Sequence, residues 1–119
     1  MAVSGDAAHA TSPHHGSGAG FAIEDSAVMA EILADEHVRA PQDIEVAFAA
    51  FDAIRRQRDQ WLVKSSRFLG DAYEGMVPEI RTEWEKAHRE LVQRYDEILS
   101  IDISKECERA KEYLHKRLA

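Results

Sequence analysis

Apolar residues recur at helical spacing over most of the chain beyond residue 20. Between Phe21 and Leu33 they leave little polar face, which predicts a helix that packs on several sides. Glu24 and Asp25 would stand in its first turn, where acidic side chains favour the helix dipole. A polar connection follows over residues 35–40, and Pro41 fits the first position of a second helix.

The second helix is expected to run from Pro41 to about Tyr73. Apolar residues keep helical spacing over most of that length: Ile44, Ala47, Phe48, Phe51, Ile54, Trp61, Leu62, Phe68 and Leu69. At roughly 1.5 Å per residue it would span on the order of 45 Å. That length exceeds what a domain of this size needs, which indicates a helix that evolved to cross something larger.

Two shorter helices are predicted after a turn marked by Gly70, Gly75 and Pro78. The first, expected to pack on the long helix, carries one apolar face: Ile80, Trp84, Ala87, Leu91, Tyr95 and Ile98. The last can be capped by Asp102 or Ser104, and its buried side is marked by Cys107, Ala110, Leu114 and Leu118. The only strand-like stretch is 2–4. The predicted fold is therefore mainly α: a glycine-rich loop followed by about four helices, one of them very long.

Composition limits the chain to one small domain. It has 119 residues, of which 45% are hydrophobic and 31% charged, too few to enclose a large cofactor unaided. The net charge of -7 argues against a nucleic-acid or anionic-membrane surface. We expect no membrane span and no signal peptide. The single cysteine, Cys107, reads as a buried or half-buried structural thiol in a reducing compartment, so a cytoplasmic location is expected.

The residues most specific for chemistry lie at the start of the chain. Gly5 permits a tight turn, and the carboxylate of Asp6 can accept hydrogen bonds from sugar-alcohol hydroxyls. Pro13 fixes the following loop, and Gly16, Gly18 and Gly20 allow close approach to a flat ligand before a helix begins. The helix N-terminus suits an anionic oxygen. Phe21 stands where the dinucleotide fingerprint G-x-G-x-x-G requires its third glycine, which excludes a Rossmann phosphate loop.

This stretch, from Gly5-Asp6 through Pro13 and Gly16-x-Gly18-x-Gly20 to Glu24-Asp25, resembles the second flavin-contacting motif of the FAD-dependent aromatic hydroxylases, specifically the salicylate hydroxylase-like monooxygenases. Every position of the motif is matched. The long helix extends the resemblance through its Arg-Arg-x-Arg cluster, Arg55, Arg56 and Arg58. In that family the motif lies in the second half of a much longer chain, so the sequence is expected to be a C-terminal part that lacks the dinucleotide-binding and substrate regions.

The resemblance implies FAD as cofactor, with reduced nicotinamide, NAD(P)H, as hydride donor and a small aromatic compound as substrate. It implies flavin contacts at Gly5, Asp6, Pro13, Gly16, Gly18 and Ala19. Residues 1–20 would then be a remnant flavin-contacting loop and residues 21–119 a helical region. The resemblance identifies no catalytic residue. The chain alone is expected to bind FAD weakly or not at all, because most contacts to the adenosine and pyrophosphate would come from the absent region.

Two functions remain open at this stage. The chain is either a truncated monooxygenase, active only when a complementing flavoprotein chain completes it, or a non-oxidative helical protein that binds a small molecule or another protein. Self-association is expected because helices that evolved to cover a sheet expose apolar faces without it.

The other polar residues point to no further site. Three histidines near the motif, His9, His14 and His15, are interpreted as solvated or cofactor-adjacent, and no metal site is expected. His37, His88 and His115 are scattered along the sequence. The arginine cluster is interpreted as an exposed basic face paired with acidic neighbours. Trp61 and Trp84 are expected in the core.

Overall fold

The computed structural model describes residues 1–118 as helices joined by turns and loops, with no β-strand among them. The elements in order are α1 (Asp6–His9), the 3-10 turn η1 (Pro13–His15), α2 (Gly18–Leu33), α3 (Pro41–Tyr73), α4 (Trp84–Leu99) and α5 (Ile103–Leu118). The mainly α fold with one very long helix is confirmed. Within residues 1–118, no helix is both long and apolar enough to span a bilayer.

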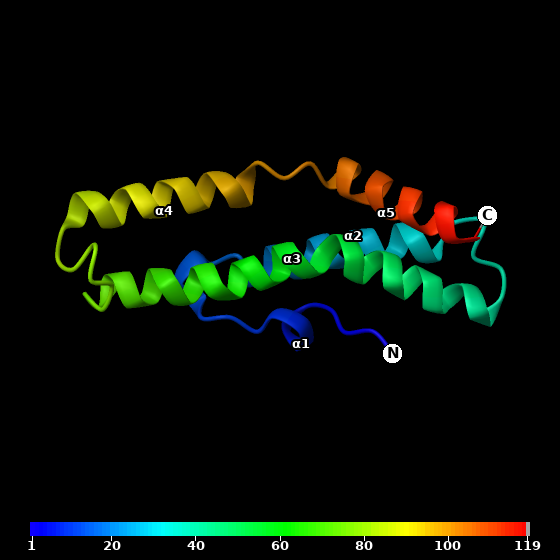
Figure 1. Ribbon diagram of the computed structural model, residues 1–119, viewed down its shortest axis with the longest axis horizontal. Coiled ribbons are helices and arrows are strands. Elements are labelled where there is room, and N and C mark those ends of the chain that lie inside the picture. Colours follow the sequence, from blue (N-terminus) through cyan, green and yellow to red (C-terminus); the bar gives the residue numbers. More distant parts are fainter. Residues whose placement is uncertain (119) are drawn as a thin grey trace.

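The long helix α3 is the axis on which the other elements pack. In Figure 1, α4 and α5 follow one another along one side of α3, and the N-terminal segment with α1 lies on the opposite side. The chain measures 56 × 24 × 20 Å as a result. The start of α3 is fixed by Pro41 and by Asp43, whose Oδ2 accepts the backbone N–H groups of Arg39 and Ala40, both at 2.9 Å.

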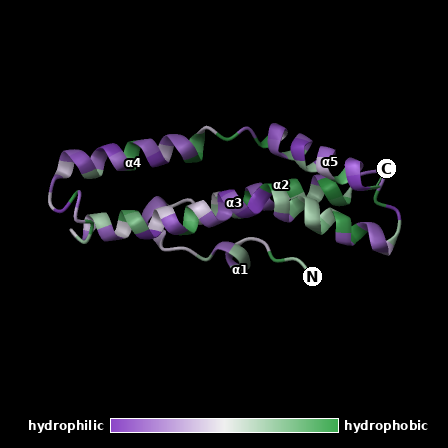
Figure 2. Ribbon diagram, viewed as in Figure 1, coloured by the Kyte–Doolittle hydropathy of each residue, from purple (hydrophilic) through white to green (hydrophobic). Residues whose placement is uncertain are grey.

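The buried apolar side chains form three clusters spaced along α3. The first joins α2, α3 and α5 through Val28, Ile32, Ala47, Ala50, Phe51, Ala110 and Leu114. The second joins Phe21, Leu62 and Ile98, and the third joins Ala72, Ile80 and Ala87. Figure 2 shows hydrophobic residues concentrated where α2 and α3 lie side by side, whereas α4 and α5 carry extended hydrophilic surfaces. The first part of α3 therefore holds α2 and α5 together, and its later part holds the end of α2 that carries Phe21 and the helix α4.

The predicted helix ends differ from the observed ones in two places. The helix α2 begins at Gly18 rather than Phe21, since the Phe21 N–H already donates to the Ser17 carbonyl at 3.0 Å. Glu24 and Asp25 consequently stand in its interior instead of its first turn. Gly70 was expected in a turn but is a buried residue of α3.

The apolar face expected on the third helix is only partly buried. The helix α4 begins at Trp84, so Ile80 belongs to the preceding turn. Ala87 and Ile98 are buried, but Trp84 is 76% exposed and Tyr95 45% exposed. Placing Trp84 in the core was therefore wrong, whereas Trp61 packs, half-buried, beside Phe21 and Leu62. The predicted cap of α5 is confirmed, because Asp102 Oδ1 accepts the backbone N–H groups of Ser104 and Lys105.

Candidate functional site

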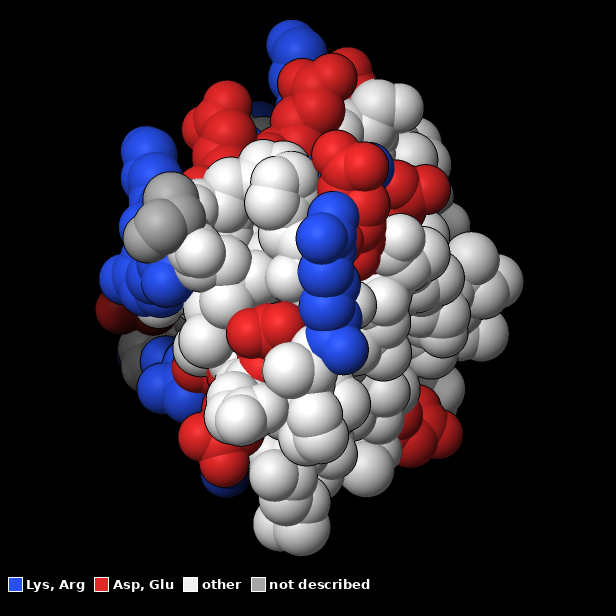
Figure 3. Space-filling view, turned by 90° about the vertical axis from the view of Figure 1, so that its right-hand side faces the viewer, with Lys and Arg blue, Asp and Glu red and all other residues white. Residues whose placement is uncertain are grey.

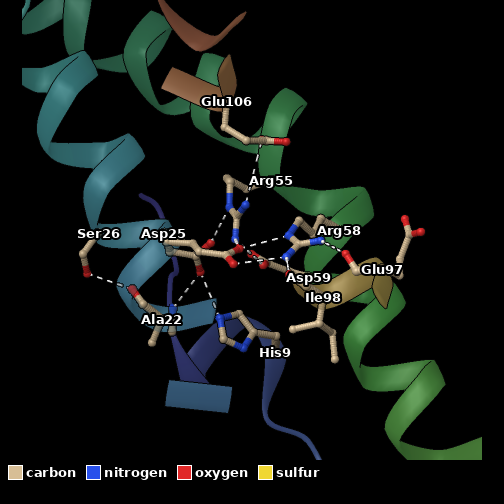
Figure 4. A network of polar contacts seen from close by, with 12 residues as sticks. His9, Ala22, Asp25, Ser26, Arg55, Arg58, Asp59, Glu97, Ile98 and Glu106 are labelled. Atoms are coloured by element: carbon tan, nitrogen blue, oxygen red, sulfur yellow. Dashed lines mark hydrogen bonds and ion pairs between the residues drawn. The ribbon is translucent and has the colours of Figure 1, made fainter. Parts of the chain in front are cut away.

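The Gly5–His9 turn is attached to α2 by one buried carboxylate, that of Asp25 (Figure 4). Gly5 has a φ of 58°, in the left-handed region that glycine adopts freely, and its N–H donates to Asp25 Oδ2 at 3.1 Å. The buried ring of His9 lies with Nε2 2.9 Å from the same oxygen. Asp25 therefore fixes both ends of α1, the first of the two short helical segments that precede α2.

A fully buried arginine, Arg55 of α3, binds the other oxygen of Asp25. Its Nε donates to Asp25 Oδ1 at 2.8 Å, and its Nη2 donates to Glu24 at 2.8 Å and to Asp59 at 3.2 Å. Glu106 of α5 lies 3.8 Å from Nη1. One guanidinium thus connects α2, α3 and α5 (Figure 4).

The prediction of an exposed arginine face is wrong for two of its three members. Arg55 is buried, and Arg58 is mostly buried because it reaches Glu24 at 3.0 Å and lies over the Phe21 ring. Arg56 alone fits the prediction, since it is exposed and pairs with Asp52 one helical turn away. Arg55 and Arg58 lie inside because carboxylates from other elements neutralise them.

The charge states in this network are set by burial and by hydrogen bonds. Burial raises the pKa of Asp59 to about 8, and its hydrogen bond to Asp25 adds to the shift, outweighing the attraction of Arg55. For Asp25 burial acts in the same direction, but hydrogen bonds with Asp59, Arg55 and the Gly5 N–H outweigh it and hold its pKa below the usual range. At neutral pH the network therefore contains a protonated Asp59 that donates to an ionised Asp25.

A second histidine attaches the η1 turn to α3. The buried ring of His15 stacks on Trp61, and its Nε2 lies 2.8 Å from Ser65 Oγ. Arg94 of α4 donates to the same hydroxyl at 2.6 Å. Burial, with Arg94 nearby, lowers the pKa of His15, so this ring is neutral at physiological pH. The interpretation of His9 and His15 as solvated or cofactor-adjacent is replaced by one in which both are buried structural anchors.

The remaining histidine of this segment, His14, lies against α3 at Gly70. A Cβ on Gly70 would stand 2.6 Å from His14 Cε1, so the absence of a side chain there allows the imidazole to approach the helix.

The residues predicted to contact a flavin lie on the outer side of this anchored segment. Asp6, Pro13, Gly16 and Ala19 are exposed, and Gly5 and Gly18 are half-buried. Gly16 has a φ of 62°, which a residue with a side chain adopts only with strain. The side chain of Asp6 has no hydrogen bond within residues 1–118, and no side chain caps the N-terminus of α2.

These exposed groups define what the segment can bind. A free carboxylate accepts hydroxyl protons, and the first N–H groups of α2, from Gly18 onward, can donate to an anionic oxygen. The three histidines of the segment are all engaged internally, His9 with Asp25, His14 with Ser12 and His15 with Ser65, so we infer no proton transfer or nucleophilic step from them.

Asp25, Arg55 and Asp59 are the site-organising residues whose role the sequence did not reveal. A signal was present, since Arg55 and Asp59 follow Phe51 at four-residue steps and precede Leu62 on the same face of α3. Charged residues in line with buried apolar positions indicate internal ion pairs.

No family model matches the chain. The chain is 38% identical over its full length to FAD-dependent monooxygenase orf3 of Aspergillus niger, of which it covers 29%. It is 40% identical over 99% of its length to FAD-dependent monooxygenase pigN of Monascus ruber, again covering 29%. Over 73% of its length it is 42% identical to salicylate hydroxylase asL1 of Sarocladium schorii, of which it covers 21%. The chain thus spans less than a third of the length of these relatives.

Proposed function

We propose, from the premise that the chain belongs to the FAD-dependent monooxygenase family, that its Gly5–Gly20 segment forms one wall of a flavin site. The rest of the site would come from a complementing flavoprotein chain. The completed assembly would hydroxylate an aromatic or polyketide-type small molecule. The proposal treats residues 1–20 as the cofactor-contacting part and residues 21–119 as its helical support.

The observation that carries the proposal is the double anchoring of an exposed segment. His9 and His15 are buried against α2 and α3, while the intervening and following residues Pro13, Gly16 and Ala19 face outward. A binding loop held in this way loses little conformational entropy when a ligand docks. A segment that served only to cover α3 would gain nothing from an uncapped helix end and an unpaired carboxylate at its surface.

The residues present fit the contacts that a flavin needs on one side. Asp6 would accept hydrogen bonds from the ribityl hydroxyls, and the N-terminus of α2 would stabilise negative charge on the ring. Gly5, Gly16 and Gly18 would allow the backbone to approach, with Pro13 near the ring edge. The flavin, reduced by NAD(P)H, supplies the oxygen chemistry when bound, and this chain supplies orientation and charge.

The chain by itself does not fit a whole FAD molecule. The contacts described here involve a short anchored segment, and no single loop offsets the entropy of ordering so large a ligand. We therefore expect the isolated chain to be inactive and to bind FAD weakly or not at all.

A second candidate function is suggested by a groove of about 530 Å³ between α3 and the start of α5. Gln57 and Trp61 line it on one side and Lys105 and Arg109 on the other. A helical protein that binds a small molecule without oxidation would use this groove, and its ligand would leave FAD binding unchanged.

The test of the flavin function is complementation. A homologous monooxygenase from which the matching segment has been deleted would be mixed with this chain, and FAD would be titrated by fluorescence quenching. Asp6→Ala should weaken FAD binding about tenfold to a hundredfold, since a lost hydrogen bond to a charged group costs roughly 1.5–3 kcal/mol. Gly18→Val should weaken it at least as much by blocking approach.

Arg56→Ala is the matched control, because this residue is exposed and its guanidinium pairs with Asp52 of its own helix. The pair that contains Arg56→Ala should bind FAD with the same affinity as the unmodified pair. Equal FAD affinities for all three variants, or equal FAD binding by the truncated monooxygenase without this chain, would reject a cofactor role for the segment.

A further inference from the structure

The polypeptide brings Asp35, His37 and His115 together at the end of the molecule where α5 terminates. Asp35 and His37 lie in the α2–α3 connection, and His115 lies in the last turn of α5. His37 Nδ1 is 2.8 Å from Asp35 Oδ1, and His115 Nε2 is 2.8 Å from Asp35 Oδ2. The two imidazole rings are 4.4 Å apart between centroids. One carboxylate and two imidazoles therefore converge, although 80 residues separate Asp35 from His115 in sequence.

The surrounding backbone holds the carboxylate in this position. Asp35 Oδ1 also accepts the His37 N–H at 3.0 Å, and the Asp35 carbonyl accepts the Val38 N–H at 3.0 Å. The side chain of Asp35 is 7% exposed, whereas those of His37 and His115 are about half exposed at 49% and 43%. The carboxylate is thus rigidly placed, and the imidazoles remain accessible from solvent.

This donor set has the composition of a transition-metal site. Imidazole nitrogen suits zinc, copper, iron and nickel, and a carboxylate oxygen completes a three-ligand set with room for water. The three ligating atoms lie within 4.8 Å of one another. Ligands about 2.1 Å from a tetrahedral zinc ion stand about 3.4 Å apart, so the two 2.8 Å contacts to Asp35 need to open by about 0.6 Å.

The electrostatic surroundings permit a cation. Lys111 interacts electrostatically with Asp35, but its ammonium is already paired with Glu31 at 2.7 Å. Figure 3 shows this end of the molecule, where acidic and basic residues are interspersed and no continuous basic surface forms.

A comparison within the chain shows why this cluster, and not another, is favoured. His9, Asp25 and Asp59 also bring three ligating atoms within 4.8 Å of one another. There, however, the guanidinium of Arg55 is 2.8 Å from Asp25 and already supplies the positive charge that the carboxylates require. A metal ion would have to displace that buried arginine.

We propose that Asp35, His37 and His115 bind a divalent transition metal of the zinc class, which fastens the C-terminal turn of α5 to the α2–α3 connection. The site is independent of the flavin-contacting segment at the other side of α3. Its consequence is structural: the metal would add a fixed link between two parts of the chain that are held otherwise by the apolar cluster around Ile32 and Leu114.

The test uses the full chain without an affinity tag, treated with a chelator and titrated with zinc chloride by calorimetry. One equivalent of Zn²⁺ should bind, and Co²⁺ in its place should give the visible absorption of a tetrahedral site. His115→Gln and His37→Gln should each lower the affinity for Zn²⁺ at least tenfold, because even the loss of a residue that only supports a ligand lowers metal affinity tenfold to a hundredfold. Mg²⁺ should not bind, since it requires more oxygen ligands.

His88→Gln is the control, because His88 is an exposed histidine of α4 outside the cluster. It should leave zinc affinity unchanged, and circular dichroism would verify that all variants keep the native helix content. Zinc should also raise the unfolding temperature of the unmodified chain but not that of His115→Gln. The proposal is overturned if zinc binds with no stoichiometric site, if His115→Gln binds within twofold of the unmodified chain, or if His88→Gln loses the site.

Discussion

Asp59 is the residue whose protonation most strongly links folding to pH. Its pKa of about 8 in the folded chain lies well above the ordinary value of 3.8, because the side chain is buried beside Asp25. Between these values the folded chain keeps a proton that the unfolded chain has released. Stability is therefore highest below about pH 4, as far as this group is concerned, and is lost as pH rises through about 8.

We predict that Asp59→Asn removes most of this pH dependence. The amide keeps a donor toward Asp25 and cannot ionise, so the unfolding free energy of the variant should vary less between pH 5 and 8. For the unmodified chain the contribution approaches about 1.4 kcal/mol per pH unit. Urea denaturation at several pH values would measure it, with the exposed Asp52→Asn as control. Parallel pH profiles for Asp59→Asn and the unmodified chain would contradict the prediction.

Among the elements, α2 and α3 depend on each other through a polar contact as well as an apolar one. Arg55 binds Glu24 and Asp25 from α2 and Asp59 from its own helix. Removing one partner of a buried ion network leaves the other charges without compensation and strongly lowers the unfolding free energy. Replacing the whole network by apolar side chains would cost less.

We predict that Arg55→Met lowers the unfolding free energy by about 3–5 kcal/mol. Methionine fills much of the volume but leaves the carboxylate of Asp25 without its cation, whereas Glu24 keeps its ion pair with Arg58. Arg56→Met, next in sequence and exposed, should change stability by less than about 0.5 kcal/mol. Chemical denaturation monitored by circular dichroism would compare them, and similar losses in both variants would show that the network is not what holds α2 on α3.

The helices could be predicted from sequence to a large extent, and the site only in part. Apolar periodicity and the capping residues Pro41 and Asp102 indicate where α3 and α5 begin. The burial of Arg55 could not be predicted, because it requires carboxylates from α2, α3 and α5 that come together only in three dimensions. The meeting of His37 and His115 depends on tertiary structure in the same way. Asp6 and Gly16 are exposed, as residues of a binding loop need to be.

The whole molecule is extended and leaves an apolar surface on α4. Its radius of gyration is 17.0 Å, compared with about 13.5 Å expected for a compact domain of this length. Trp84, Val92, Tyr95 and Leu99 are all exposed. On a helix they fall within an arc of about 80°, so they form a strip along one side of α4, interrupted by His88, beside the residues that contact α3.

We predict that the chain self-associates through this strip at micromolar concentration, because exposed contiguous apolar surface favours association. Replacing both Trp84 and Leu99 by serine should shift the chain toward monomer in sedimentation velocity. Ile23→Ser is the matched control, since Ile23 is an equally exposed apolar residue on α2. A monomer at every concentration, or an equal shift for Ile23→Ser, would count against association through α4.

The double use of Asp25 has a consequence for how such sequences evolve. Its carboxylate serves the Gly5 turn and the Arg55 network at once, so selection for folding alone would retain Gly5, His9 and Asp25 after any cofactor had been lost. Asp6 makes no such internal contact, and only a ligand would preserve it. In a library of random variants sorted for folding, Asp6 should drift freely while Asp25 stays fixed. Sorting the same library for flavin retention in the complemented assembly should retain both residues. Retention of Asp6 would then indicate cofactor binding, whereas retention of Asp25 would indicate only that the inherited fold is kept.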